Sequence, residues 1–155
     1  MILSNQVRCH KCGDTPFSSH RHDFRHCRCG SIAVDGGMSY LRRAGNIDAY
    51  DDMSITFPDE AAHKIIYALN QVIGDEGDYS PASLLLVVAR ALEEEGITVD
   101  RHREEHEGAI DEAFAAAVVW ASQNGRNGLG ALCAVARYVR DAGGIWMFKE
   151  EPVNA

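Results

Sequence analysis

The residues best suited to chemistry are four cysteines near the start of the chain. Cys9 and Cys12 form one pair, Cys27 and Cys29 form a second, and each pair is followed directly by glycine. Short loops of this kind turn the backbone so that two sulfurs point at one ion, and glycine accepts the positive φ that such a turn needs. The pattern predicts one structural Zn²⁺ held by these four cysteines. Free or redox-active thiols are the alternative.

The placement of the cysteines also bears on the compartment. Clustered cysteines indicate metal ligands in a reducing environment, whereas the fifth, Cys133, lies in an apolar stretch and is expected to be a small core residue. No apolar run approaches the roughly 20 residues that cross a membrane, and the first residues do not resemble a secretory signal. We therefore expect a cytoplasmic protein with no membrane contact.

The segment between the two cysteine pairs is rich in histidine, arginine and aromatic side chains. It contains, in order, His20, Arg21, His22, Phe24, Arg25 and His26. One interpretation is a second metal site, since imidazole binds zinc well. A second is a basic finger that contacts phosphates and stacks Phe24 on a base. A third is that Phe24 fills the small core and the polar residues are solvated. The sequence leaves these three open.

Charge is divided unevenly along the chain. Residues 1–46 contain seven Lys/Arg against three Asp/Glu, and residues 47–155 contain eight against twenty. Arginine is a forked donor suited to phosphate or carboxylate. We therefore predict a binding surface on the N-terminal part, with nucleic acid or a host protein as partner. Its expected residues are Arg21, Phe24, Arg25, Arg28, Arg42 and Arg43.

A family resemblance covers residues 7–45. It rests on the runs C-H-K-C-G-D, S-x-H-R-H-D-F and C-R-C-G-S-I-A-V-D-G-G-M-S-Y-L-R-R-A-G, taken in that order. These resemble a small zinc-ribbon family of unknown function found in tailed-bacteriophage genomes. The resemblance implies that the four cysteines take the family's apparent metal positions. It also implies a phage or prophage origin, and hence a host-cell cytoplasm, but no activity.

The remaining patterns predict a mostly α-helical protein with an N-terminal zinc ribbon. We expect the ribbon over residues 1–45, with a hairpin between residues 31–34 and 39–42, and a linker over 46–57. Apolar residues at helical spacing, with Ser80-Pro81 as a start signal, predict an acidic four-helix bundle over 58–148. Residues 149–155 are expected to form a tail.

The predicted function is non-enzymatic binding, because four thiolates leave zinc no open position for water. One alternative is an inhibitor of a host defence or transcription complex, in which the acidic helical part occupies a basic groove. A second alternative is a metal-dependent hydrolase on the acidic helices. Its candidate carboxylates would be Glu93, Glu94, Glu95, Glu104, Glu105, Glu107, Asp111 and Glu112.

Overall fold

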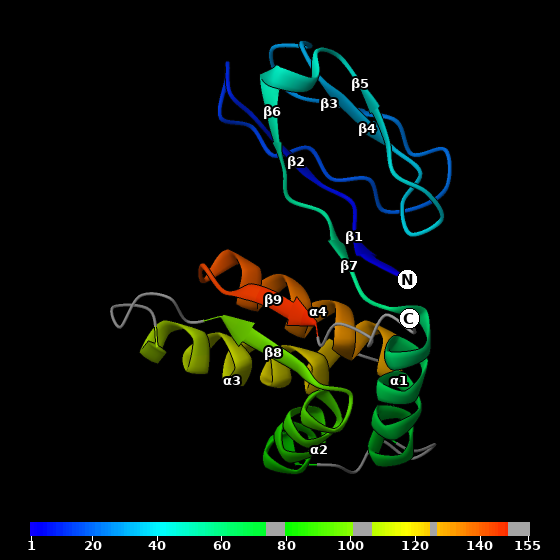
Figure 1. Ribbon diagram of the computed structural model, residues 1–155, viewed down its shortest axis with the longest axis vertical. Helices are drawn as coiled ribbons and strands as arrows, with labels where there is room; N and C mark the ends of the chain where they lie inside the picture. The colour runs from blue at the N-terminus through cyan, green and yellow to red at the C-terminus, as the bar shows by residue number, and fades with distance from the viewer. Residues whose placement is uncertain (74–79, 101–106, 125–126, 149–155) are drawn as a thin grey trace, which may run out of the picture. The chain divides into compact units, whose positions relative to one another are not determined.

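The computed structural model of the chain describes residues 1–73, 80–100, 107–124 and 127–148 (Figure 1). The chain divides into two compact units, Met1–Pro58 and Asp59–Ala155. We describe each unit by itself. The predicted tail, residues 149–155, lies outside the described residues.

The first unit is built from short strands that pair across long stretches of sequence. Two pairs, β1 with β7 and β2 with β6, and the three-stranded sheet β3-β4-β5 are all antiparallel. A single 3₁₀ turn, Ile47–Ala49, precedes β6. The strands are β1 (Ile2–Ser4), β2 (Val7–Cys9), β3 (Arg25–His26), β4 (Ala33–Asp35), β5 (Arg42–Ala44), β6 (Tyr50–Asp52) and β7 (Ile55–Thr56).

A small core and a buried polar clamp hold this unit together. The core consists of Val7, Cys9, Cys27, Ile32 and Val34. The clamp is centred on Asn5, which is 1% exposed, and its Nδ2 lies 3.0–3.1 Å from the carbonyl oxygens of Asp35, Gly37 and Tyr40. Arg43 completes the clamp by donating to Asn5 Oδ1 at 2.7 Å. Because the Asp35 carbonyl ends β4 and the other two carbonyls belong to the loop between β4 and β5, the clamp fixes that loop.

The second unit contains four helices and one strand pair. Ser80 caps α2 and Asn127 caps α4, each through a side-chain oxygen that accepts a backbone N–H three residues on. The helices are α1 (Asp59–Ile73), α2 (Pro81–Glu94), α3 (Glu107–Asn124) and α4 (Gly128–Asp141). Strand β8 (Ile97–Asp100) pairs antiparallel with β9 (Ile145–Phe148) over four residue pairs.

The prediction of a mostly α-helical fold is wrong. The described residues form four α-helices together with nine strands in four small sheets, so the fold is mixed α/β. The strands β1, β2, β6 and β7 escaped prediction because they are two or three residues long and pair with partners far away in the sequence. Alternation cannot be recognised over so few residues. The segment 46–57 contains two of these strands, β6 and β7.

The C-terminal apolar run forms a strand that packs on the helices of its unit. Residues 145–148 form β9, and Trp146 packs edge-to-face on Phe114 with ring centres 6.1 Å apart.

None of the helices in the described part of the chain is long and apolar enough to span a membrane.

A close approach between α1 and α4 yields the first prediction. Gly128 donates its N–H to Asn70 Oδ1 at 2.6 Å, and a Cβ added at Gly128 would lie 2.4 Å from the Ile66 carbonyl oxygen. We expect Gly128→Ala to lower the free energy of unfolding by about 1–3 kcal/mol, because backbone has to move. Chemical denaturation followed by circular dichroism measures this change.

Gly130→Ala is the matched control, since the nearest atom to its added Cβ is a side-chain oxygen 3.4 Å away. Alanine is favoured over glycine in a helix, so this variant should be neutral or more stable by up to about 1 kcal/mol. Equal effects from the two substitutions would contradict the packing described here.

Candidate metal centre

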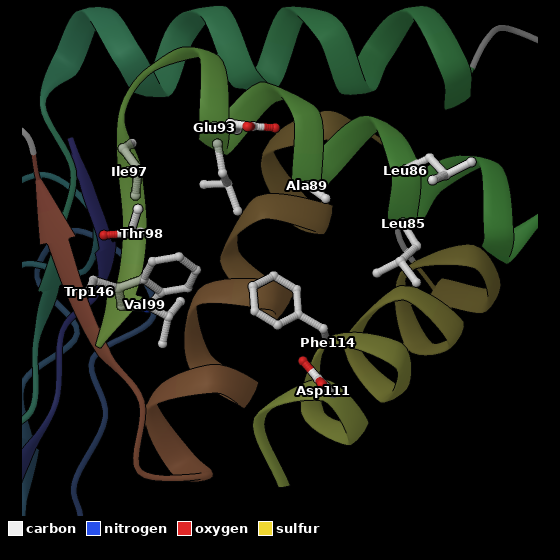
Figure 2. A pocket seen from close by; sticks show the side chains of 11 residues that line it. Leu85, Leu86, Ala89, Glu93, Ile97, Thr98, Val99, Asp111, Phe114 and Trp146 are labelled. Atoms are coloured by element: carbon white, nitrogen blue, oxygen red, sulfur yellow. The ribbon is translucent and has the colours of Figure 1, made fainter. Parts of the chain in front are cut away.

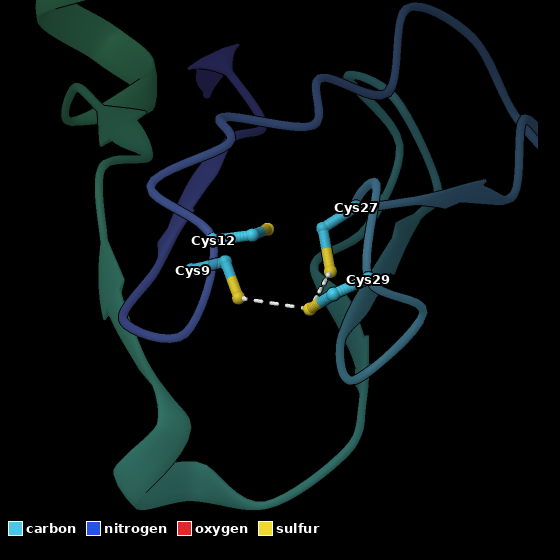
Figure 3. Close-up of side chains that lie close together, drawn as sticks. All are labelled: Cys9, Cys12, Cys27 and Cys29. Carbon is cyan, nitrogen blue, oxygen red and sulfur yellow. Dashed lines mark hydrogen bonds between the residues drawn. The ribbon is translucent and has the colours of Figure 1, made fainter.

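The four cysteine sulfurs lie close enough to hold one metal ion. All four Sγ atoms lie within 4.8 Å of one another. Sγ of Cys29 is 3.7 Å from that of Cys9 and 3.5 Å from that of Cys27 (Figure 3). Four sulfurs about 2.3 Å from a tetrahedral zinc would be about 3.8 Å apart. The cluster is therefore compatible with zinc, in agreement with the spacing of the cysteines.

Two similar loops bring the sulfurs together. In the first, the Gly13 N–H donates to the Cys9 carbonyl at 2.9 Å, and in the second the Gly30 N–H donates to the Cys27 carbonyl at 2.9 Å. Both glycines have positive φ, 67° and 72°, a conformation that other residues rarely adopt. Cys9 and Cys27 are also core residues. The folding of the unit and the assembly of the site thus depend on the same side chains.

Ser31 is a site residue that the sequence analysis missed. Its Oγ lies 3.0 Å from Sγ of Cys29, 3.3 Å from Sγ of Cys9 and 3.7 Å from Sγ of Cys27. A hydroxyl in this position donates to thiolate and stabilises its negative charge. The only signal in the sequence was its place immediately after the second Cys-Gly turn.

Hydrogen bonds favour the thiolate form at two of the cysteines. The Ser31 hydroxyl is the main group that holds the pKa of the Cys9 thiol below its usual value. Burial raises the pKa of Cys27, but bonds from the Ile32 backbone, Ser31 and the neighbouring cysteines outweigh it and lower the pKa to about 6. At these two cysteines a metal therefore competes with fewer protons at neutral pH, whereas the pKa of Cys12 is shifted in the opposite direction.

The three histidines between the cysteine pairs do not converge. Among the described residues, only the four cysteines form a group of three or more ligand side chains close enough to share an ion. His22 lies 3.1 Å from the Tyr40 hydroxyl through Nδ1, and His26 packs edge-to-face on Phe24 with ring centres 5.0 Å apart. The second-metal interpretation of this segment thus has no support in the described residues.

The sheet β3-β4-β5 separates the predicted binding residues onto two faces. Successive side chains of a strand point to opposite faces, and directly paired residues share a face. Arg25, Val34 and Arg43 are paired in one row, and Val34 is a member of the core cluster, which places this row on the core side, although the Arg25 side chain at the sheet edge is 60% exposed. Arg42 pairs with Asp35 in the next row, so these two lie on the opposite side.

That opposite side carries exposed rings beside an arginine. Phe24 is 45% exposed and contacts His26, while the Tyr40 hydroxyl donates to Asp35 Oδ2 at 3.1 Å. The Arg42 guanidinium lies 3.8 Å from the same Asp35 oxygen and its side chain is 68% exposed. We call Phe24, His26, Tyr40 and Arg42 the aromatic face.

The other predicted arginines have different surroundings. Arg43 is 13% exposed and donates to Asp52 and Ser54 as well as to Asn5, so it has a structural role. Arg25 is paired with Asp23 at 2.5 Å. Arg28 donates to the Cys12 carbonyl at 3.2 Å, beside the sulfurs, and Arg21 is exposed in the turn that precedes β3.

The carboxylates proposed for a hydrolase do not form a metal site in the described residues. The cysteines are the only such cluster there, and Glu93 and Asp111 line a cavity that is otherwise mainly apolar. Glu104 and Glu105 lie outside the described residues, as does the side chain of Glu107.

Comparison with known proteins adds one finding. A family model described as a domain of unknown function (DUF7695) matches residues 1–45. No curated protein and no solved structure matches the chain. The match covers the four cysteines and the aromatic face, and it points to an uncharacterised family without an activity or a source organism.

The first prediction from the site concerns its metal. Inductively coupled plasma mass spectrometry of the purified protein should give close to one zinc ion per chain. The double substitution Cys27→Ser and Cys29→Ser should reduce the zinc content to near zero, because two of the four thiolate ligands are lost. Cys133→Ala is the matched control, since Cys133 lies in α4. Full zinc in the double variant would contradict the assignment.

A second prediction concerns Ser31. We expect Ser31→Ala to weaken zinc binding by about tenfold or more, because hydrogen bonds to metal ligands typically contribute that much. Competition with a chromophoric chelator measures the affinity. Ser39→Ala, which removes an exposed hydroxyl elsewhere in the unit, should leave it unchanged. Equal affinities for the Ser31→Ala variant and the unaltered protein would mean that Ser31 does not support the ligands.

Proposed function

We propose that the first unit is a structural zinc ribbon that binds single-stranded nucleic acid on its aromatic face. The observation that carries the proposal is the exposed Phe24 ring, packed against His26 on the same face as Arg42. Stacking on aromatic rings, combined with a nearby guanidinium for phosphate, is the common way in which proteins bind unpaired bases. The zinc holds the loops that carry this face.

Single strands are favoured over duplex because stacking on Phe24 needs a base whose flat surface is accessible. The aromatic face contains no long helix that would enter a major groove, and its elements are two- and three-residue strands with their loops. Arg42 is suited to the phosphate because its side chain is mostly exposed although it lies near Asp35. Arg21 and Arg28 are exposed too and would add attraction at longer range.

The metal has a structural role in this proposal. A zinc ion with four thiolate ligands has a complete tetrahedral shell, so it offers no position at which to activate water. The chain's own residues would do the binding: the rings stack and the arginine donates hydrogen bonds. No bond in the nucleic acid is broken.

The proposal predicts the effect of two substitutions. Phe24→Ala and Arg42→Gln should each weaken binding of a fluorescent single-stranded oligonucleotide, Phe24→Ala by about fivefold to a hundredfold, as expected for the loss of one stacked base. Fluorescence anisotropy of the full chain measures the affinity. The dissociation constant should rise steeply with salt because bound phosphates release counterions.

Arg8→Gln is the matched control for Arg42→Gln, since Arg8 is an exposed arginine on β2. It should change the affinity much less, and all three variants should retain zinc and the original melting temperature. Equal affinity for duplex and single strand, or no effect of Phe24→Ala, would contradict the proposed mode. If no oligonucleotide binds and a protein partner depends on the same residues, the surface serves protein binding instead.

A further inference from the structure

The second unit contains a cavity with no part in the proposed function. Helix α2, the β8–β9 strand pair and α3 line a cavity of about 660 Å³ that is open to solvent (Figure 2). This lies within the range of roughly 300–1,000 Å³ that is usual for small-molecule sites. Its lining includes Leu85 and Ala89 from α2, Val99 from β8, Phe114 from α3 and Trp146 from β9.

The wall of the cavity is held in place by specific contacts. Trp146 donates its indole N–H to the Ala136 carbonyl oxygen at 3.2 Å, and its ring lies edge-to-face against Phe114. Strand β9, which carries Trp146, is paired with β8 along its whole length. A ligand would therefore meet a preformed aromatic surface and would spend little free energy on ordering it.

The ionisable side chains of the described lining are both acidic. Among the described residues that line the cavity, Glu93 on α2 and Asp111 on α3 are the only ionisable ones, and the others are apolar except for Thr98. Figure 2 shows the two carboxylates on different walls. Arg90, the arginine of α2, is paired with Glu94 at 2.8 Å and lies outside the lining.

We propose that this cavity binds a small amphipathic cation, an apolar molecule that carries one protonated amine. The apolar body would be removed from water against the leucine, valine and aromatic side chains, which supplies the main driving force. The ammonium group would donate hydrogen bonds to the carboxylate of Glu93 or Asp111, which selects a cation over a neutral molecule or an anion. This inference is independent of nucleic-acid binding because it concerns the other unit.

Three probes with eight carbon atoms each test the proposal: 1-aminooctane, 1-octanol and octanoate. The protein is the full chain with Trp120→Phe, which leaves Trp146 as the single remaining tryptophan of the two in the sequence. Trp146 fluorescence then reports occupation of the cavity. We expect 1-aminooctane to bind at least about tenfold more tightly than octanol, as one charge-assisted hydrogen bond predicts, and octanoate to bind most weakly.

Two pairs of variants distinguish binding in the cavity from non-specific binding of a cation to an acidic protein. Glu93→Gln with Asp111→Asn should remove the preference for the amine over the alcohol, whereas Glu112→Gln, an exposed carboxylate of α3 outside the lining, should preserve it. Ala89→Phe should fill the cavity and weaken all three probes. Ala116→Phe adds the same ring at an exposed position of α3 outside the lining, and it should leave the binding of all three probes unchanged.

Other outcomes overturn the proposal. Equal binding of amine and alcohol, or a preference that survives loss of both carboxylates, would show that the charges do not select the ligand. Undiminished binding to the Ala89→Phe variant would place the probes elsewhere. If none of the probes binds, the cavity is not a small-molecule site, and the apolar side chains of a partner protein become the occupant to test. Circular dichroism establishes that each variant is folded.

Discussion

The convergence of four sulfurs is the constraint on which the first unit depends. Cys9 and Cys27 are both ligand candidates and members of the core cluster around the site, whose other members are Val7, Ile32 and Val34. So small a core stabilises a fold weakly, and small domains of this kind usually need a metal or disulfides. Four thiolates within 4.8 Å of one another also repel strongly unless a cation neutralises them. A bound metal would remove the repulsion and tie the two loops together at once.

The aromatic face depends on that arrangement through a chain of polar contacts. Strand β3 leads directly into the second cysteine loop, and β4 follows it, so the metal loop sets the spacing of the sheet. The loop between β4 and β5 is then held by Asn5 and Arg43. Gly37 belongs to this loop, and its Cβ position lies 2.4 Å from the His20 backbone, so no larger residue fits there. Rings exposed on such a scaffold keep their positions, which favours stacking on a partner.

The second unit is held together by the packing of apolar helix faces. Its helices bury apolar faces against one another, and α4 approaches α1 closely where Gly128 meets the Ile66 carbonyl. Helix α2 has apolar residues around most of its circumference, so the bundle cannot cover all of them: Leu84 and Val88 are fully buried, whereas Leu86 is 72% exposed at the cavity. The strand pair β8–β9 covers part of the remaining apolar surface and thereby forms a wall of the cavity.

Local patterns were enough to predict the features with local causes. The cysteine ligands follow from the spacing of two Cys-Gly loops, α2 follows from its start signal Ser80-Pro81, and both α2 and α4 follow from helical periodicity. Each single loop and each helix depends on residues that lie close together in the sequence. The residues whose interactions specify these features are close in the sequence, so the sequence by itself determined them.

Tertiary structure alone decided the features that depend on distant residues. Strands β1 and β7 are too short to show alternation and exist because they pair with each other, and the sequence alone therefore led to a mostly helical prediction that was wrong. The same holds for Ser31, which acquires its role only when three sulfurs surround it. Arg42 and Arg43 are adjacent in β5 and lie on opposite faces, and the register with β4 places Arg43 opposite Val34, where it is clamped, and leaves Arg42 exposed. Neighbouring residues in a strand always diverge in this way, but which of them faces solvent is set by what packs on the sheet.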